Sequence, residues 1–73
     1  MKKISIIGLG YIGLPTAIIA AQAGFDVYGF DTNSQRVKTI NNGTSPLFEP
    51  EITERLWKVL KAGAFKAFYD LIS

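Results

Sequence analysis

Hydrophobic and polar positions along the chain predict alternating strands and helices. Residues 3–7 form a nearly continuous β-branched run, which is typical of a parallel strand that lies centrally in its sheet and is buried on both faces. Residues 12–23 are rich in alanine, isoleucine and leucine, which predicts a helix, and Gly24 supplies its C-terminal stop. A second strand is predicted over residues 26–31. The connection is short, so we expect a compact β-α-β unit with a right-handed crossover.

The pattern after the second strand predicts a short helix. Thr32–Ser34 offer helix N-caps, and the apolar positions Val37 and Ile40 indicate an amphipathic helix that ends near Gly43. Residues 44–48 are expected to form a loop.

The last part of the chain predicts one more helix and one more strand. The helix begins at Pro50, because proline suits the first helical turn. Trp57 on this helix is interpreted as a packing residue, with a nucleotide-stacking platform as the alternative. Residues 65–69 are predicted to form the third strand. Together the elements predict an α/β fold, a Rossmann-like half of a doubly wound parallel sheet with three strands in the order 3-2-1.

A Gly-x-Gly-x-x-Gly pattern follows the first strand directly and opens the first helix. Gly8 allows a tight turn, Gly10 lets the backbone approach a pyrophosphate, and Gly13 lets the helix pack closely on the strand. Asp31 ends the second strand, where an acidic side chain can form hydrogen bonds with the hydroxyl groups of the adenosine ribose. This context predicts dinucleotide binding, and a strand-to-helix turn without a ligand is the alternative.

Composition and charge exclude several classes of function. The net charge of +2 comes from eight basic and six acidic residues scattered along the chain. The sequence therefore lacks the cluster of basic residues that is typical of nucleic-acid binding. The sequence has no cysteine and no histidine, so we assign no catalytic and no metal-binding residue. The apolar run after Lys2 and Lys3 is broken by glycines and is too short to span a membrane. We therefore expect a cytoplasmic protein without membrane contact.

Four short motifs occur in a characteristic order. They are Gly-Leu-Gly-Tyr-Ile-Gly-Leu-Pro at 8–15, Phe-Asp at 30–31, Ile-Asn-Asn-Gly at 40–43 and Glu-Pro at 49–50. With these motifs the chain resembles the amino-terminal end of the nucleotide-sugar (UDP-glucose/GDP-mannose) dehydrogenase family. The sequence at 11–15, Tyr-Ile-Gly-Leu-Pro, most resembles the branch of the family that acts on UDP-N-acetylmannosamine. The resemblance implies an NAD-dependent oxidation of the C6 hydroxyl of a UDP-sugar, of the UDP-N-acetylmannosamine or UDP-glucose type, to a carboxylate, and a role in polysaccharide biosynthesis.

The resemblance also implies which residues contact NAD. They are the pyrophosphate-turn glycines Gly8, Gly10 and Gly13, the helix-start residues Tyr11 and Ile12, and the ribose residues Asp31 and Arg36. For Arg36 a solvated position on the second helix is the alternative, although a cation in a first helical turn opposes the helix dipole. The motif at 49–50 is sufficiently explained as a helix start, and we assign it no catalytic role.

The sequence departs from the family in two respects. The family's catalytic cysteine and the lysine and asparagine that assist it lie beyond the end of this chain, and residues 68–73 are bulkier than the family pattern. We therefore expect residues 1–73 to be an N-terminal fragment of an NAD-binding domain that is inactive alone, with the UDP-sugar bound only by the longer protein. We also expect self-association through the exposed edge of the first strand. A non-catalytic module, or one that binds FAD, is the alternative function.

Overall fold

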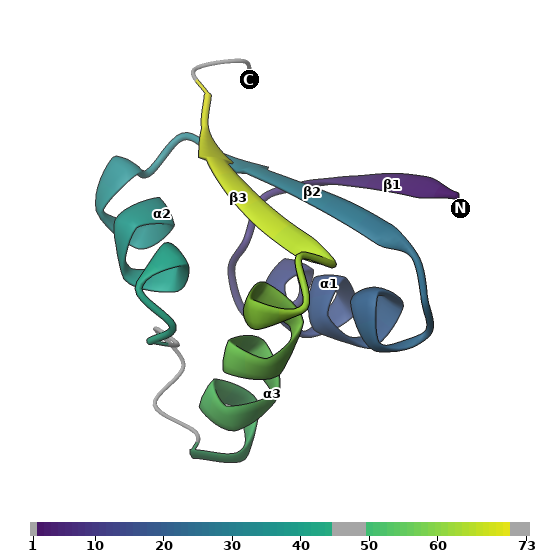
Figure 1. Ribbon diagram of the computed structural model, residues 1–73. Coiled ribbons are helices and arrows are strands. Elements are labelled where there is room, and N and C mark those ends of the chain that lie inside the picture. The colour runs from purple at the N-terminus through teal and green to yellow at the C-terminus, as the bar shows by residue number, and fades with distance from the viewer. Residues whose placement is uncertain (1, 45–49, 71–73) are drawn as a thin grey trace.

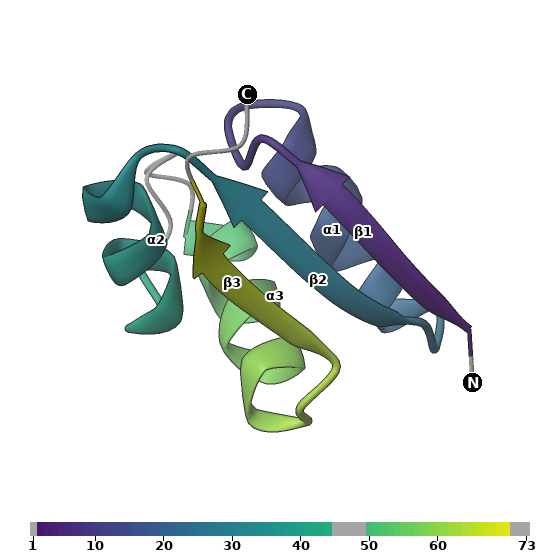
Figure 2. The same ribbon diagram turned by 90° about the horizontal axis from the view of Figure 1, so that it is seen from above.

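The computed structural model describes residues 2–44 and 50–70, and it has the predicted alternation of strands and helices (Figure 1). The elements are β1 (Lys3–Ile7), α1 (Gly13–Gln22), β2 (Asp26–Asp31), α2 (Ser34–Asn41), α3 (Pro50–Lys61) and β3 (Phe65–Tyr69). The strands form one parallel sheet in the order β1-β2-β3, which confirms the predicted order 3-2-1. The helices of the described chain all lie on one face of this sheet (Figures 1 and 2).

The predicted bounds agree with the structure to within about a residue or two. Helix α1 is one residue shorter at each end than the predicted 12–23. It stops before Gly24, whose φ of 102° is a conformation that favours glycine. Asn33 is the N-cap of α2, since its side chain accepts a hydrogen bond from the Arg36 N–H. The loop predicted at 44–48 and the glutamate of the 49–50 motif fall almost wholly outside the described residues.

The prediction that the first strand is buried on both faces is wrong for this chain, although its edge position agrees with the predicted order 3-2-1. Strand β1 lies at the edge of the sheet and alternates between exposed and partly buried residues. Ile6 packs toward the helices, whereas Ile7 on the opposite face is 71% exposed. The β-branched run is typical of a strand covered by helices on both sides, but the helices of the described chain cover one side only.

A hydrophobic core fills the space between the sheet and the helices. Its largest fully buried side chains come from every layer of this packing, namely Leu9, Leu14, Val27, Ile40, Leu56 and Phe65. Gly29 on β2 allows the core to close, because a Cβ there would lie 2.7 Å from Leu9 Cδ2 and 3.0 Å from Phe65 Cε1. The sheet therefore presents one packed face to the helices.

The opposite face of the sheet, which we call the open face, carries an aromatic cluster. The Phe68 ring stacks with Phe30 at a centroid distance of 5.4 Å and with Tyr28 at 6.2 Å. Ser5 and Ile7 of β1 lie on the same face, as the alternation of side chains along the strand requires.

Trp57 packs on the turn that follows α2. A Cβ added at Gly43 would lie 2.8 Å from Trp57 Cζ3, so the indole ring lies directly against this glycine. The ring remains half exposed. This contact supports the packing interpretation of Trp57.

Over residues 2–44 and 50–70, no helix combines the length and the apolar character that crossing a membrane requires. The cytoplasmic location stays a prediction.

Candidate functional site

Three glycines shape the turn between β1 and α1, and each has a different surrounding. Gly8 has a φ of 90°, which side chains rarely adopt, and its N–H donates to the Phe30 carbonyl at 2.7 Å. At Gly13 a Cβ would collide with the Gly8 carbonyl oxygen and lie 2.9 Å from the Gly8 carbonyl carbon. These neighbours are backbone atoms, so Gly13 is required for the close approach of α1 to β1, as predicted.

Gly10 is not required by the described chain itself. Its φ lies outside the range that favours glycine, and a Cβ built there would meet no atom within 4 Å. The space beside Gly10 is therefore open, and the backbone of the turn can be approached closely from outside.

The N-terminus of α1 lies next to the open space at Gly10. Ile12 is the N-cap residue and makes no side-chain capping hydrogen bond, and the first turn contains no acidic residue. Its own cap and first turn thus leave the positive end of the helix without a neutralising side chain, which suits an anionic ligand. Tyr11 and Ile12 project beside it and are 83% and 82% exposed.

Asp31 links the end of β2 to this turn. The residue is only 7% exposed, and its Oδ2 accepts the Leu9 N–H at 2.8 Å. Its Oδ1 accepts the Asn33 N–H at 2.8 Å, and Oδ2 also accepts from Nη1 of Arg36 at 3.0 Å. Burial raises the pKa of the Asp31 carboxyl, but the two backbone N–H groups and the guanidinium outweigh it, so this pKa lies below its ordinary value. The carboxylate is therefore ionised at neutral pH.

Arg36 has a partner that explains a cation in the first turn of α2. Its guanidinium forms an ion pair with Asp31, and its side chain is 36% exposed. The backbone N–H of Arg36 is capped by Asn33 Oδ1 at 3.0 Å. The structure thus brings Asp31 and Arg36 together.

Leu9 and Asn33 are parts of the site that sequence reasoning missed. Leu9 acts through its backbone N–H, which no side-chain pattern reveals. Asn33 was noted only as a helix cap, but its N–H also holds the Asp31 carboxylate. The signal that could have indicated this role is Asp31 itself, because an aspartate side chain often accepts the backbone N–H two residues further along the chain.

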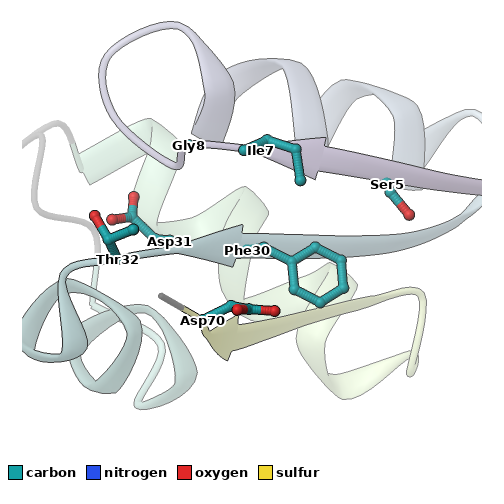
Figure 3. Close-up of a pocket in the computed structure, with 7 residues that line it drawn as sticks. All are labelled: Ser5, Ile7, Gly8, Phe30, Asp31, Thr32 and Asp70. Carbon is teal, nitrogen blue, oxygen red and sulfur yellow. The ribbon is translucent and has the colours of Figure 1, made fainter. Parts of the chain in front are cut away.

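A hollow of about 360 Å³ lies beside Asp31 at the ends of the strands (Figure 3). Ile7 and Phe30 line it from neighbouring strands, and Asp31, Thr32 and Asp70 lie at its end near the C-termini of β2 and β3. In open α/β sheets, ligands bind outside the carboxyl ends of the strands. The turn, the acid and this hollow all lie at that end of the sheet. Within residues 2–44 and 50–70, no cluster of acidic side chains could hold a metal ion.

The sequence profile of the UDP-glucose/GDP-mannose dehydrogenase family, NAD binding domain, matches residues 2–72. The chain belongs to this family. Its similarity to UDP-N-acetyl-D-mannosamine dehydrogenase of Pyrococcus horikoshii is 52% identity over 64 residues, covering 88% of this chain and 15% of that protein. GDP-mannose 6-dehydrogenase of Pseudomonas syringae pv. tomato is 43% identical over 68 residues, covering 93% of this chain and 16% of that protein.

Family membership extends to solved structures. The structure of the UDP-N-acetylmannosamine dehydrogenase of Pyrococcus horikoshii matches with a TM-score of 0.88 at 48% identity, covering 93% of this chain and 16% of that chain. This chain therefore spans about one sixth of the length of the family members that it matches. The predicted family and the predicted NAD-binding type of domain are confirmed.

Proposed function

We propose that residues 1–73 bind NAD at the carboxyl end of β1 and β2, as part of the NAD-binding domain of a nucleotide-sugar dehydrogenase. The observation that carries the proposal is Gly10. Neither its backbone conformation nor its neighbours within the described chain call for a glycine. Close approach of a ligand to the backbone supplies the reason, because a side chain there would lie between the turn and the ligand.

In this proposal the pyrophosphate lies against the glycine turn and the N-terminus of α1. Gly8 and Gly13 give the turn its shape, and Gly10 leaves the backbone accessible. The uncapped helix end attracts the negative charge of the phosphates. Tyr11 and Ile12 lie against the cofactor where they project from the helix start.

The adenosine ribose lies at Asp31 and Arg36. A carboxylate offers about four acceptor positions, and Asp31 uses three of them for Leu9, Asn33 and Arg36 among the described residues. One position on Oδ1 remains for a ribose hydroxyl. The guanidinium of Arg36 has further N–H groups that can donate to a second ribose oxygen.

The activity proposed for the longer protein is the oxidation of the C6 hydroxyl of a UDP-sugar to a carboxylate, in which two molecules of NAD each accept one hydride and water supplies the second carboxylate oxygen. Relatives named for UDP-N-acetyl-D-mannosamine support this substrate class, and relatives named for GDP-mannose make a GDP-sugar the competing one. The chain itself has no cysteine, so it cannot form the thioester intermediate of the family. We therefore expect no turnover by residues 1–73. Absorbance at the NADH wavelength should stay constant with NAD and UDP-N-acetylmannosamine, and a steady increase would contradict this expectation.

Calorimetric titration of the chain with NAD, NADP and FAD tests the proposal. Saturable binding of NAD that is tighter than that of NADP is expected, because Asp31 would face the 2′-phosphate of NADP. Tighter binding of FAD would instead support the alternative module. No binding of any of the three would contradict the proposal.

A further inference from the structure

Helix α2 ends in an asparagine followed by a glycine, Asn42 and Gly43. In such a pair the main-chain nitrogen of the glycine can attack the side chain of the asparagine and close a succinimide ring. Glycine favours this attack, because it has no side chain that hinders the approach of its nitrogen. The pair is therefore chemically reactive, and the surrounding structure decides whether it reacts.

The reaction needs only water as a co-reactant, and nothing is oxidised or reduced. The Gly43 nitrogen loses its proton and bonds to Cγ of Asn42, while the bond from Cγ to Nδ2 breaks and ammonia leaves with that proton. Water then opens the ring. Cleavage at Cγ gives aspartate, and cleavage at the main-chain carbonyl carbon gives isoaspartate, in which the main chain passes through the former side chain. Both products have a carboxylate in place of the amide.

The folded backbone holds the pair in an unreactive geometry. The ψ of Asn42 is 2°, so the Gly43 nitrogen eclipses the nitrogen of Asn42. The succinimide ring instead requires this nitrogen to lie beside Cβ of Asn42. The Gly43 N–H also donates to the Ile40 carbonyl at 2.9 Å, and the Thr44 N–H donates to the Thr39 carbonyl at 3.1 Å, which is the Schellman arrangement of a helix end. Attack therefore requires that this helix end opens.

The Trp57 ring keeps this helix end closed. Gly43 is buried, and a Cβ added to it would lie 2.8 Å from Trp57 Cζ3. Asn42 next to it is exposed, so water reaches the amide. Rotation of the peptide between Asn42 and Gly43 would move Gly43 away from the ring and from its φ of 82°. The ring contact is thus lost in every conformation that can react.

We propose that Asn42 is a deamidation site, and that the contact of Trp57 with Gly43 sets the rate of the reaction. The rate in the folded chain is the rate of the unprotected pair multiplied by the fraction of molecules in which the end of α2 is open. Local openings of this kind cost less free energy than global unfolding. The inference rests on the turn after α2 and is independent of the proposed NAD binding.

Isoaspartate at position 42 would weaken the junction between α2 and β3. It adds a methylene group to the main chain directly after Asn41. The Asn41 Nδ2 donates to the Ala67 carbonyl at 3.0 Å, and its Oδ1 accepts the Ala67 N–H at 3.4 Å. The longer main chain also displaces Gly43 from Trp57. The reacted chain should therefore have a lower melting temperature than the unreacted one.

Peptide mapping by mass spectrometry, after incubation in mildly alkaline buffer, tests the proposal. Deamidation changes the mass of the peptide, because a hydroxyl group replaces an NH2 group. Trp57→Ala removes the ring and leaves Asn42 and Gly43 unchanged. It should raise the rate at position 42 roughly tenfold, through a larger open fraction. Trp57→Phe keeps part of the contact and should give an intermediate rate. Circular dichroism checks that both variants are folded.

Asn33 is the internal control for global unfolding. It precedes the small residue Ser34, and its Oδ1 accepts the Arg36 N–H at the other end of α2. Trypsin cleaves after Arg36 and Lys38, so Asn33 and Asn42 fall in different peptides. Trp57→Ala should leave the rate at Asn33 nearly unchanged. Equal increases at both asparagines would overturn the proposal, because global unfolding would then set the rate.

Two further measurements complete the test. Asn42→Gln in the Trp57→Ala background should abolish the mass change of the peptide that contains position 42, because glutamine closes its larger ring more slowly. In guanidinium chloride the parent chain and Trp57→Ala should deamidate at one common rate, faster than either folded chain. A folded parent chain that reacts as fast as the unfolded one would overturn the proposal. Equal rates in folded Trp57→Ala and the folded parent chain would also overturn it.

Discussion

At the scale of single residues, Gly10 and Gly13 separate ligand binding from packing. Both lie in the same turn, but an added methyl group meets open space at Gly10 and backbone atoms at Gly13. A glycine motif therefore combines two kinds of requirement, and the same substitution at the two positions distinguishes them.

Gly10→Ala is expected to keep the stability of the chain and to weaken NAD binding. The methyl group has room in the free protein but lies between the turn and the pyrophosphate, and lost charge-assisted hydrogen bonds correspond to a loss in affinity of roughly tenfold or more. Gly13→Ala should lower the free energy of unfolding by about 1–3 kcal/mol through overpacking. Thermal melts and NAD titrations of both variants measure the two effects. A loss of stability in Gly10→Ala equal to that in Gly13→Ala would contradict the assignment.

Asp31 and Arg36 together are expected to set the choice between NAD and NADP. In Asp31→Ser the negative charge is removed and the Arg36 guanidinium, freed from its ion pair, can bind the 2′-phosphate of NADP. The ratio of the NADP to the NAD association constant should rise by roughly tenfold or more. Titration of the double variant Asp31→Ser/Arg36→Ala is the control, and it should lose this gain. An unchanged ratio in Asp31→Ser would show that the pair does not contact the ribose.

The lowered pKa of Asp31 predicts a dependence of stability on pH. Because the folded state holds this carboxyl ionised to lower pH than the unfolded state does, the contribution is fully present above the unfolded pKa of about 3.9. It is lost as the pH falls through the lower pKa of the folded state. The difference in melting temperature between the parent and Asp31→Asn should be constant above about pH 5 and shrink below about pH 4. A difference that stays constant down to pH 2 would contradict the lowered pKa.

At the scale of elements, local patterns were sufficient to predict most of the fold. The strand runs, the Pro50 helix start and the glycine stops are local signals, and the structure has them at the predicted positions. The edge position of β1 follows from the predicted order 3-2-1. The exposure of its outer face was not predictable, because a β-branched run does not reveal how many layers cover the sheet. The links from Leu9 to Asp31 and from Asn41 to Ala67 span 22 and 26 residues. Such contacts depend on how the elements assemble.

Asn41 is expected to stabilise the pairing of α2 with β3. Asn41→Ala removes both hydrogen bonds to Ala67 and should lower the free energy of unfolding by about 1–2 kcal/mol. Asn42→Ala, at the neighbouring exposed C-cap position, is the matched control and should have a smaller effect. Urea unfolding of both variants measures the difference. An effect in Asn41→Ala no larger than in the control would show that the β3 edge does not depend on this amide.

At the scale of the whole molecule, the small size of the chain means that ligand binding adds a large share to the free energy of unfolding. A domain of this length has a single core between one sheet face and its helices, and such a core supplies only a few kcal/mol of net stability. The open face and the β1 edge add nothing to that core unless something covers them. Binding energy at the turn is therefore a large fraction of the total.

NAD is expected to raise the melting temperature of this chain by an unusually large amount. A ligand at 100 times its dissociation constant stabilises the folded state by about 2.7 kcal/mol. Each kcal/mol shifts the melting temperature of a 60–100-residue domain by roughly 4–8 °C, so a shift on the order of 10–20 °C follows. Differential scanning calorimetry at fixed protein concentration measures it, which keeps self-association constant between samples. Gly10→Ala in the same NAD concentration should show a much smaller shift. A parent chain whose melting temperature does not respond to millimolar NAD would contradict the proposed site, because linkage requires a shift from any ligand bound only to the folded state.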